Sequence, residues 1–133
     1  MIYALDSDAI AYYFRGEGRV GERLLACPAR DIAVPAVVAY ELRYGLARMQ
    51  GFARRAAQLE TFLASATILP FDDDCARVAA RLRVALERVG APIGPIDTLI
   101  AATALASHAV LVTRKVREFS RVEGLEVEDW YAG

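Results

Sequence analysis

The stretch that decides the fold most clearly is residues 92–113, which read PIGPIDTLIAATALASHAVLVT. Pro92–Pro95 predicts a loop, and the alanine-rich segment Ile96–Ser107 predicts a helix whose end His108 would cap. Ala109–Thr113 is a short, almost wholly apolar run, which is typical of a fully buried strand. A helix that leads directly into a buried strand indicates an α/β protein.

The same alternation continues in both directions from this stretch. Further strands are predicted at Ile2–Leu5, Ile32–Val34, Thr67–Leu69 and, as a last edge strand, Leu125–Val127. Further helices are predicted at Ala9–Arg15, Arg19–Ala26, Pro35 to about Gln50, Arg54–Ser65 and Asp72–Val89. Strands that alternate with helices predict an α/β fold with a mainly parallel sheet of roughly five strands, covered by helices on both faces.

Length and composition favour one globular domain over residues 1–133. Hydrophobic residues make up 56% of the chain and charged residues 25%, which is the composition of a folded protein. No apolar run approaches the roughly 20 residues that span a bilayer, and the residues before Asp6 do not resemble a secretory signal. Cys27 and Cys75 are expected to be free thiols in a reducing compartment, so we expect a cytoplasmic protein.

Charge alone gives no general argument for nucleic-acid binding, because the net charge is −1. It is nevertheless uneven along the chain. The acidic run Asp72–Asp74 suits the positive N-terminal end of a helix. A basic cluster near the end consists of Arg114, Lys115, Arg117 and Arg121. This cluster is either a solvated surface or part of a binding site, and the sequence leaves both open.

Three acidic residues on separate predicted elements are candidate ligands, and an α/β fold binds ligands beyond the carboxyl ends of its strands. Asp6 follows the first predicted strand, and Asp97 lies at the start of a helix that follows a loop. Glu41 lies in mid-helix among apolar residues, where a carboxylate is costly unless it faces a cation or a donor. Oxygen ligands of this kind suit Mg²⁺ or Mn²⁺. Each carboxylate, taken singly, could equally be a helix cap or a surface group.

Local motifs around these residues resemble those of PIN-domain ribonucleases. Leu5-Asp6-Ser7-Asp8 is similar to the opening of that family, and Tyr40-Glu41-Leu42-Arg43-Tyr44-Gly45 is similar to its glutamate-bearing helix. The segment from Ile93 to Ala102 resembles its Ile-Gly-Pro-x-Asp motif. Leu111-Val112-Thr113, Arg117-Glu118-Phe119 and Val127-Glu128-Asp129-Trp130 resemble the tail of VapC toxins, a bacterial branch of the family.

The resemblance implies a three-layer α/β/α sandwich that acts as a Mg²⁺- or Mn²⁺-dependent endoribonuclease. It implies that Asp6, Glu41 and Asp97 are the catalytic acidic residues, with Asp6 and Asp97 as the principal metal ligands. Ser7 and Thr113 match supporting hydroxyl positions. RNA as substrate, a VapB-type antitoxin as partner and a homodimer are also implied.

Lys115 departs from the family pattern, which has Asn or Asp at that position. A cation there should repel a metal ion or compete for its carboxylates. Lys115 could pair with Asp6 or Asp97 and weaken the site, or it could turn outward and contact RNA phosphate. It could also be an alteration that does not represent the active ancestral protein.

Two other enzyme or receiver classes explain the sequence less well. Asp6 and Asp8 after a strand, with Thr113 and Lys115 later, also suit phosphohydrolases with an aspartyl-phosphate intermediate, but that class leaves Glu41 unexplained. A phosphoreceiver domain would need an acceptor aspartate near the middle of the chain, and the stretch from Val34 to Glu60 contains none. The remaining alternative is a catalytically weakened PIN-like module that binds RNA or an antitoxin, since fold does not dictate activity.

Overall fold

The protein is described here as a computed structural model, in which residues 1–132 are placed and Gly133 lies outside the described part. The elements follow in the order β1 (Tyr3–Leu5), α1 (Ser7–Arg15), α2 (Val20–Ala26), η1 (Ala29–Asp31), β2 (Ile32–Pro35), α3 (Ala36–Ala47), α4 (Ala53–Ser65), β3 (Thr67–Leu69), α5 (Asp73–Arg88), α6 (Pro95–Ala106), β4 (Val110–Val112), α7 (Val116–Phe119) and β5 (Val127–Glu128). Strands and helices alternate, as the sequence predicted.

The five strands of the described chain form one parallel sheet in the order β3-β2-β1-β4-β5. Ala4 in the central strand β1 lies opposite Ala33 on one side and Leu111 on the other. The chain moves outward from β1 to β2 and β3, and then crosses to β4 and β5. The strand order therefore reverses beside β1, which is where parallel sheets bind ligands.

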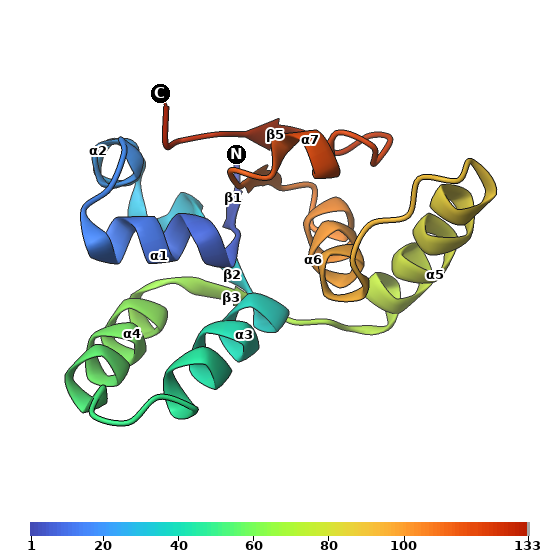
Figure 1. Cartoon of the computed structure of the whole chain (residues 1–133). Coiled ribbons are helices and arrows are strands. Elements are labelled where there is room, and N and C mark those ends of the chain that lie inside the picture. The colour runs from blue at the N-terminus through green and yellow to red at the C-terminus, as the bar shows by residue number, and fades with distance from the viewer. Residues whose placement is uncertain (133) are drawn as a thin grey trace.

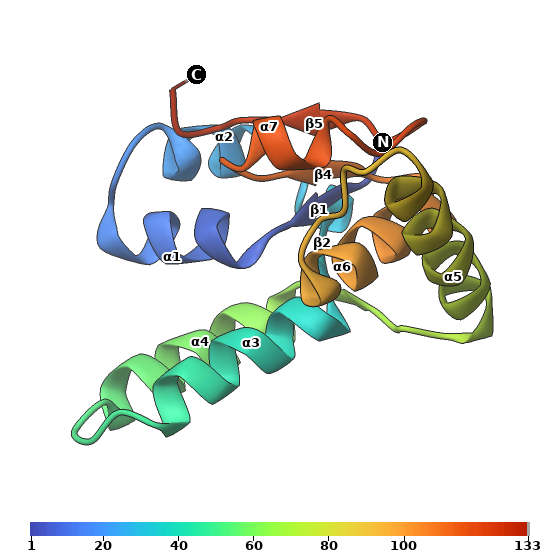
Figure 2. The ribbon, with the colours of Figure 1, turned by 45° about the vertical axis from the view of Figure 1, so that its right-hand side comes forward.

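Helices cover both faces of this sheet, so the predicted three-layer arrangement is confirmed. Figure 1 shows α1 and α2 on one side and α5 and α6 on the other, and Figure 2 shows α3 and α4 projecting from the sheet as a pair. The middle of helix α6 is buried, and its Ile100, Ala101 and Ala104 are fully inaccessible. Its small side chains let α5 approach closely, since alanine adds little bulk at the contact.

Residues at the ends of the helices cap them, and several of these residues can be recognised in the sequence. Asp72 caps α5 by accepting a hydrogen bond from the Cys75 amide at 3.0 Å. Gly90 follows that helix with φ +69°, a left-handed conformation that glycine adopts without strain. Helix α6 ends at Ala106 with Ser107 as its C-terminal cap, so His108 is not the cap that was predicted. His108 follows the cap with φ +54°, and its amide donates to the Leu105 carbonyl at 3.1 Å.

Several boundaries differ from the sequence predictions. Pro35 is the last residue of β2 and not the first residue of α3, because its extended backbone pairs with Leu69 of β3. The edge strand β5 lies at Val127–Glu128, slightly later than predicted. Helix α7 was not predicted at all. In the described part of the chain, no helix is long and apolar enough to cross a membrane.

Candidate functional site

Asp6 is the innermost acidic residue and lies directly after the central strand. Its amide donates to the Val112 carbonyl of β4, which holds it at the carboxyl end of the sheet. Its side chain is inaccessible to solvent and accepts hydrogen bonds on both oxygens. The Ser7 amide donates to Oδ1 at 2.7 Å, and the Thr113 hydroxyl donates to Oδ2 at 2.7 Å. These contacts make a buried anion tolerable in the absence of bulk water.

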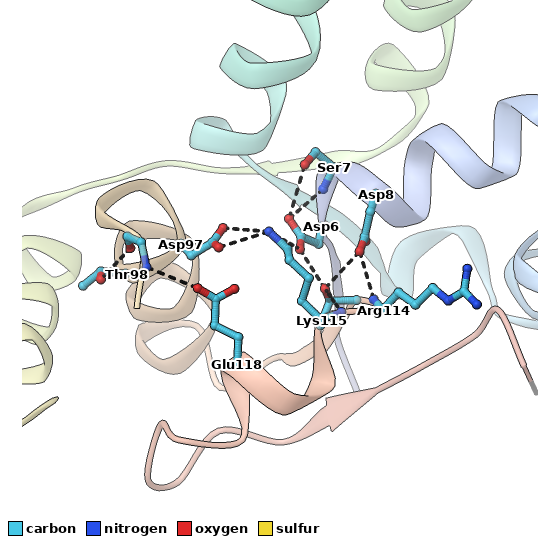
Figure 3. Close-up of polar contacts among 10 residues, drawn as sticks. Asp6, Ser7, Asp8, Asp97, Thr98, Arg114, Lys115 and Glu118 are labelled. Carbon is cyan, nitrogen blue, oxygen red and sulfur yellow. Dashed lines mark hydrogen bonds and ion pairs between the residues drawn. The ribbon is translucent and has the colours of Figure 1, made fainter. Parts of the chain in front are cut away.

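Asp97 reaches the same place from helix α6. It lies in the first turn, after Pro95 at the helix start, where the helix dipole favours a negative charge. The Lys115 ammonium lies 3.0 Å from its Oδ1 and 3.1 Å from its Oδ2. The same ammonium lies 3.7 Å from Asp6 Oδ2, so one cation bridges the two aspartates (Figure 3).

Glu41 approaches from α3, near the carboxyl end of β2. Burial, and then the charges of Asp6 and Asp97, raise the pKa of Glu41 above its usual value. Its Oε1 is buried and has no hydrogen-bond partner within residues 1–132. An unpaired, buried carboxylate oxygen is uncommon and indicates a missing donor or cation. The structure therefore brings together all three acidic residues that the sequence selected.

Glu118 is a fourth carboxylate at this place, and sequence reasoning assigned it no role. It lies on α7 beside Asp97, and its Oε1 accepts a hydrogen bond from the Gly94 amide at 3.2 Å (Figure 3). Burial and the neighbouring Asp97 raise the pKa of Glu118. Its position depends on α7, which packs through the inaccessible Phe119. We use the name acidic cluster for Asp6, Glu41, Asp97 and Glu118.

Asp8 is a further carboxylate that borders the acidic cluster. Its Oδ2 accepts from the Arg114 amide at 3.1 Å, whereas its Oδ1 is buried and without a partner in the described chain. Burial and the charge of Asp6 raise the pKa of Asp8. A signal in the sequence was its spacing of two residues from Asp6. Asp8 helps to hold the loop after β4 against the start of α1.

Both residues expected to support the aspartates contact Asp6. Ser7 does so through its amide and, at 3.5 Å, its hydroxyl. Thr113 does so through its hydroxyl, which also accepts from the Lys115 amide at 3.1 Å. Thr113 therefore joins the central aspartate to the turn that carries Lys115.

The orientation of Lys115 corrects one expectation. An outward side chain that contacts RNA phosphate is not what the structure has, because the ammonium points inward to Asp97 and Asp6. Burial lowers the pKa of Lys115, but Asp6 and the hydrogen-bonded Asp97 outweigh burial, so the pKa lies above its usual value. The residue is therefore a cation at the centre of the acidic cluster.

The donor set suits a hard divalent cation, since it consists of carboxylate oxygens of which one is unpaired. As the side chains lie, however, no three acidic, histidine or cysteine residues among residues 1–132 are placed to hold one ion. The ammonium of Lys115 lies between the aspartates instead. The residues fit Mg²⁺ or Mn²⁺ on the condition that this ammonium moves.

A parallel sheet in the order β3-β2-β1-β4-β5, with an acidic cluster where the order reverses, defines a class of α/β proteins. A family model described as the PIN domain matches residues 3–125 of this chain. The chain belongs to the PIN-domain family, in its VapC-type branch. It is 33% identical to Ribonuclease VapC2 of Rickettsia felis over 132 residues, and this match covers 98% of each chain. It is 36% identical over 99 residues to the tRNA(fMet)-specific endonuclease VapC of Shigella flexneri, which covers 74% of this chain and 75% of the relative.

Solved structures agree with this assignment. The VapBC2 complex of Rickettsia felis, bound to a DNA fragment from its promoter, matches with a TM-score of 0.90 and 32% identity over 98% of this chain and 99% of that one. The DNA-bound VapBC complex of Salmonella typhimurium matches with a TM-score of 0.89 and 30% identity, covering 98% of both chains. The resemblance that the sequence motifs indicated is confirmed.

Proposed function

We propose that this chain is a metal-dependent endoribonuclease that serves as the toxin of a type II toxin–antitoxin pair. The observation that carries the proposal is the meeting of Asp6, Glu41 and Asp97 from three separate elements, with a buried Glu41 oxygen left unpaired among residues 1–132. The names of the curated relatives, a ribonuclease and an endonuclease, supply the reaction class.

In this proposal Asp6 and Asp97 bind Mg²⁺ or Mn²⁺, and Glu41 either joins them or orients the attacking water. The bound ion would lower the pKa of a coordinated water and neutralise charge that develops on the phosphate. Ser7 and Thr113 hold Asp6 through the hydrogen bonds described above, so the aspartate would not need to reorient when substrate arrives. Lys115 could contact RNA phosphate only after leaving Asp97.

The decisive experiment is RNA cleavage by the purified chain with Mg²⁺ or Mn²⁺, with EDTA, and with Asp97→Asn. Initiator tRNA is the first RNA to test, because the name of a relative specifies tRNA(fMet). Asp74→Asn, which makes the same chemical change at an exposed position, is the matched control. We expect cleavage to be lost in EDTA and in the Asp97→Asn variant, and to be retained in the Asp74→Asn control. Cleavage that persists in EDTA would contradict the proposal, and inactive wild type under all conditions would favour the binding-module alternative.

The proposed partners are a VapB-type antitoxin and a second copy of the chain, both of which would be met in the cytoplasm. Neighbouring structures are complexes of toxin with antitoxin. Helix α3 also exposes two aromatic side chains, Tyr40 at 59% and Tyr44 at 58%, whose rings stack 6.3 Å apart. Exposed aromatics of this kind are enriched in protein interfaces. Co-purification with the antitoxin and sedimentation of the toxin alone test the two partners separately.

A further inference from the structure

Lys115 is the only lysine in the chain, and its ammonium occupies the position where the acidic residues meet. The two aspartates that it bridges come from elements 91 positions apart in the sequence (97 − 6). Its distances of 3.0 and 3.1 Å to the two oxygens of Asp97 describe a bidentate ion pair. It therefore neutralises part of the charge that a metal ion would neutralise.

The backbone fixes where this cation begins. The Lys115 amide donates to the Thr113 hydroxyl, and its carbonyl accepts from the Phe119 amide at 3.1 Å, so the residue is held between β4 and α7. Its ammonium also lies 5.5 Å from the centre of the Phe119 ring, which is fully buried. Only the side chain can therefore leave the acidic cluster without disturbing the fold.

One ammonium does not provide a partner for every carboxylate of the acidic cluster. It carries a single positive charge, whereas the acidic cluster contains four carboxylates, and within residues 1–132 the buried Oε1 of Glu41 has no partner. A divalent ion would contribute twice the charge and could accept oxygen ligands from several directions. Because the Lys115 side chain is 41% exposed, it has a path to solvent when a stronger cation arrives.

We propose that Lys115 is the resident cation of the acidic cluster: it holds Asp6 and Asp97 together in the metal-free protein, and Mg²⁺ or Mn²⁺ must displace it to bind. This inference concerns the regulation of the site and rests on the proposed function. It makes metal affinity, and hence activity at limiting metal, a property that this one side chain sets. In the metal-free protein, the place between the two aspartates is therefore occupied by a side chain of the chain itself.

The first test compares Mn²⁺ binding by isothermal titration in Lys115→Met and in Arg117→Met, without RNA. Arg117 is exposed on α7, the helix that Lys115 precedes, so its replacement removes one positive charge near the site without touching the acidic cluster. Methionine at position 115 keeps an aliphatic stem against Phe119. We expect Lys115→Met to bind Mn²⁺ at least tenfold more tightly than wild type, and Arg117→Met to change affinity by less than threefold. Equal effects of the two variants would overturn the proposal, since they would indicate a general charge effect.

The second test uses wild-type protein and does not depend on how any variant folds. An amine-selective acylating reagent can modify only Lys115 and the amino terminus, which gives an internal reference at the exposed Met1. Mass spectrometry then measures the labelling ratio in EDTA and in saturating Mn²⁺. Displacement predicts that labelling of Lys115 relative to Met1 rises at least severalfold with Mn²⁺. An unchanged ratio would mean that the ammonium stays in place and that the inference is wrong.

These measurements separate this inference from the proposed function. Mn²⁺ binding and Lys115 labelling are both measured without substrate. If they behave as expected and the chain cleaves no RNA, the nuclease proposal fails and the exchange of cations stands. If the chain cleaves RNA with Mn²⁺ and Lys115→Met behaves like Arg117→Met, the nuclease proposal stands and the resident-cation inference fails.

Discussion

Thr113 is the residue that joins the central strand, the buried aspartate and the turn before α7. Its hydroxyl donates to Asp6 and accepts from the Lys115 amide, and the side chain is 1% exposed. Thr113→Val keeps the shape but removes both hydrogen bonds, which leaves Asp6 Oδ2 with only the Lys115 ammonium, 3.7 Å away, as a partner. We expect a loss of about 1–3 kcal/mol in the free energy of unfolding, measured with urea.

The matched control for this substitution is Thr103→Val. Thr103 is also fully buried, but its hydroxyl donates at 2.8 Å to the Leu99 carbonyl one helical turn earlier. That carbonyl already accepts a backbone hydrogen bond in the helix, so the loss should be under about 1 kcal/mol. Equal losses in the two variants would show that Thr113 is only a packing residue.

Glu41 gives the metal-free protein a characteristic pH dependence. Its pKa is raised in the folded state by burial and by Asp6 and Asp97, so the folded protein binds its proton more tightly than the unfolded chain. Stability is therefore lost as the pH rises from the unfolded pKa, about 4.5, through the folded value. We expect Glu41→Gln to stabilise the protein against urea at pH 7 in EDTA, and to have little effect at pH 4.

The control is Glu123→Gln, which makes the same change at an exposed position of the C-terminal segment. It should leave the free energy of unfolding unchanged within about 0.5 kcal/mol at both pH values. A destabilising effect of Glu41→Gln at pH 7 would mean that the contacts of the carboxylate with Lys115 and Ser7 outweigh its burial, and would remove one argument for a cation site.

At the scale of the elements, strands and helices with a clear apolar pattern could be predicted from the sequence. Helix α7, which depends on tertiary packing, could not. Strands β1 and β4 are unbroken apolar runs, and α5 has both an acidic start and a glycine stop. Helix α7 has only four residues, too few for a periodic pattern, and its existence depends on the burial of Phe119 against the core. Because α7 carries Glu118, the fourth carboxylate was missed with it.

The same distinction explains what could be predicted of the site. Asp6 and Asp97 could be selected because a strand end and a helix start are visible in the sequence. The direction of Lys115 could not, since it depends on how close α6 comes to the turn after β4. The sequence therefore left three alternatives for Lys115, and the distances to Asp97 support the one in which it pairs with the aspartates.

The pair of helices α3 and α4 carries the next prediction. A hollow of about 180 Å³ opens between α1, α3 and α4. Phe14, Leu42 and Leu46 give it an apolar wall, and Arg15, Arg55 and Gln58 also line it. An apolar stretch of the proposed antitoxin would fit against this apolar wall. We expect Leu46→Glu to weaken antitoxin binding at least tenfold, measured by titration calorimetry, because a carboxylate would be desolvated in the complex.

The control is Leu25→Glu on α2, where the leucine is 83% exposed and lies outside that hollow. It should bind antitoxin like wild type, and both variants should still cleave RNA. Undiminished antitoxin binding by Leu46→Glu would place the antitoxin on another surface of the toxin.

For the whole molecule, the acidic cluster is a product of the complete fold. Its four carboxylates follow β1 or lie on α3, α6 and α7, and they span residues 6–118, so an unfolded chain offers no such site. A ligand that binds only the folded state stabilises it by mass action, by about 2.7 kcal/mol at one hundred times its dissociation constant. For a domain of this length that corresponds to a rise in Tm on the order of 10 °C.

We therefore expect Mn²⁺ to raise the Tm of the wild-type chain, measured by calorimetry, and to have almost no effect on Asp97→Asn. Asp74→Asn should respond like wild type, because Asp74 belongs to the exposed acidic run at the start of α5. That run is the main competing place for a cation, since three adjacent aspartates also attract metal. A full shift in Asp97→Asn that disappears in Asp74→Asn would place the ion there, at a helix end with no link to the carboxyl edge of the sheet. A rise in Tm that requires Asp97 would instead show that the ion stabilises the folded chain through the same carboxylates that Lys115 contacts in the metal-free state.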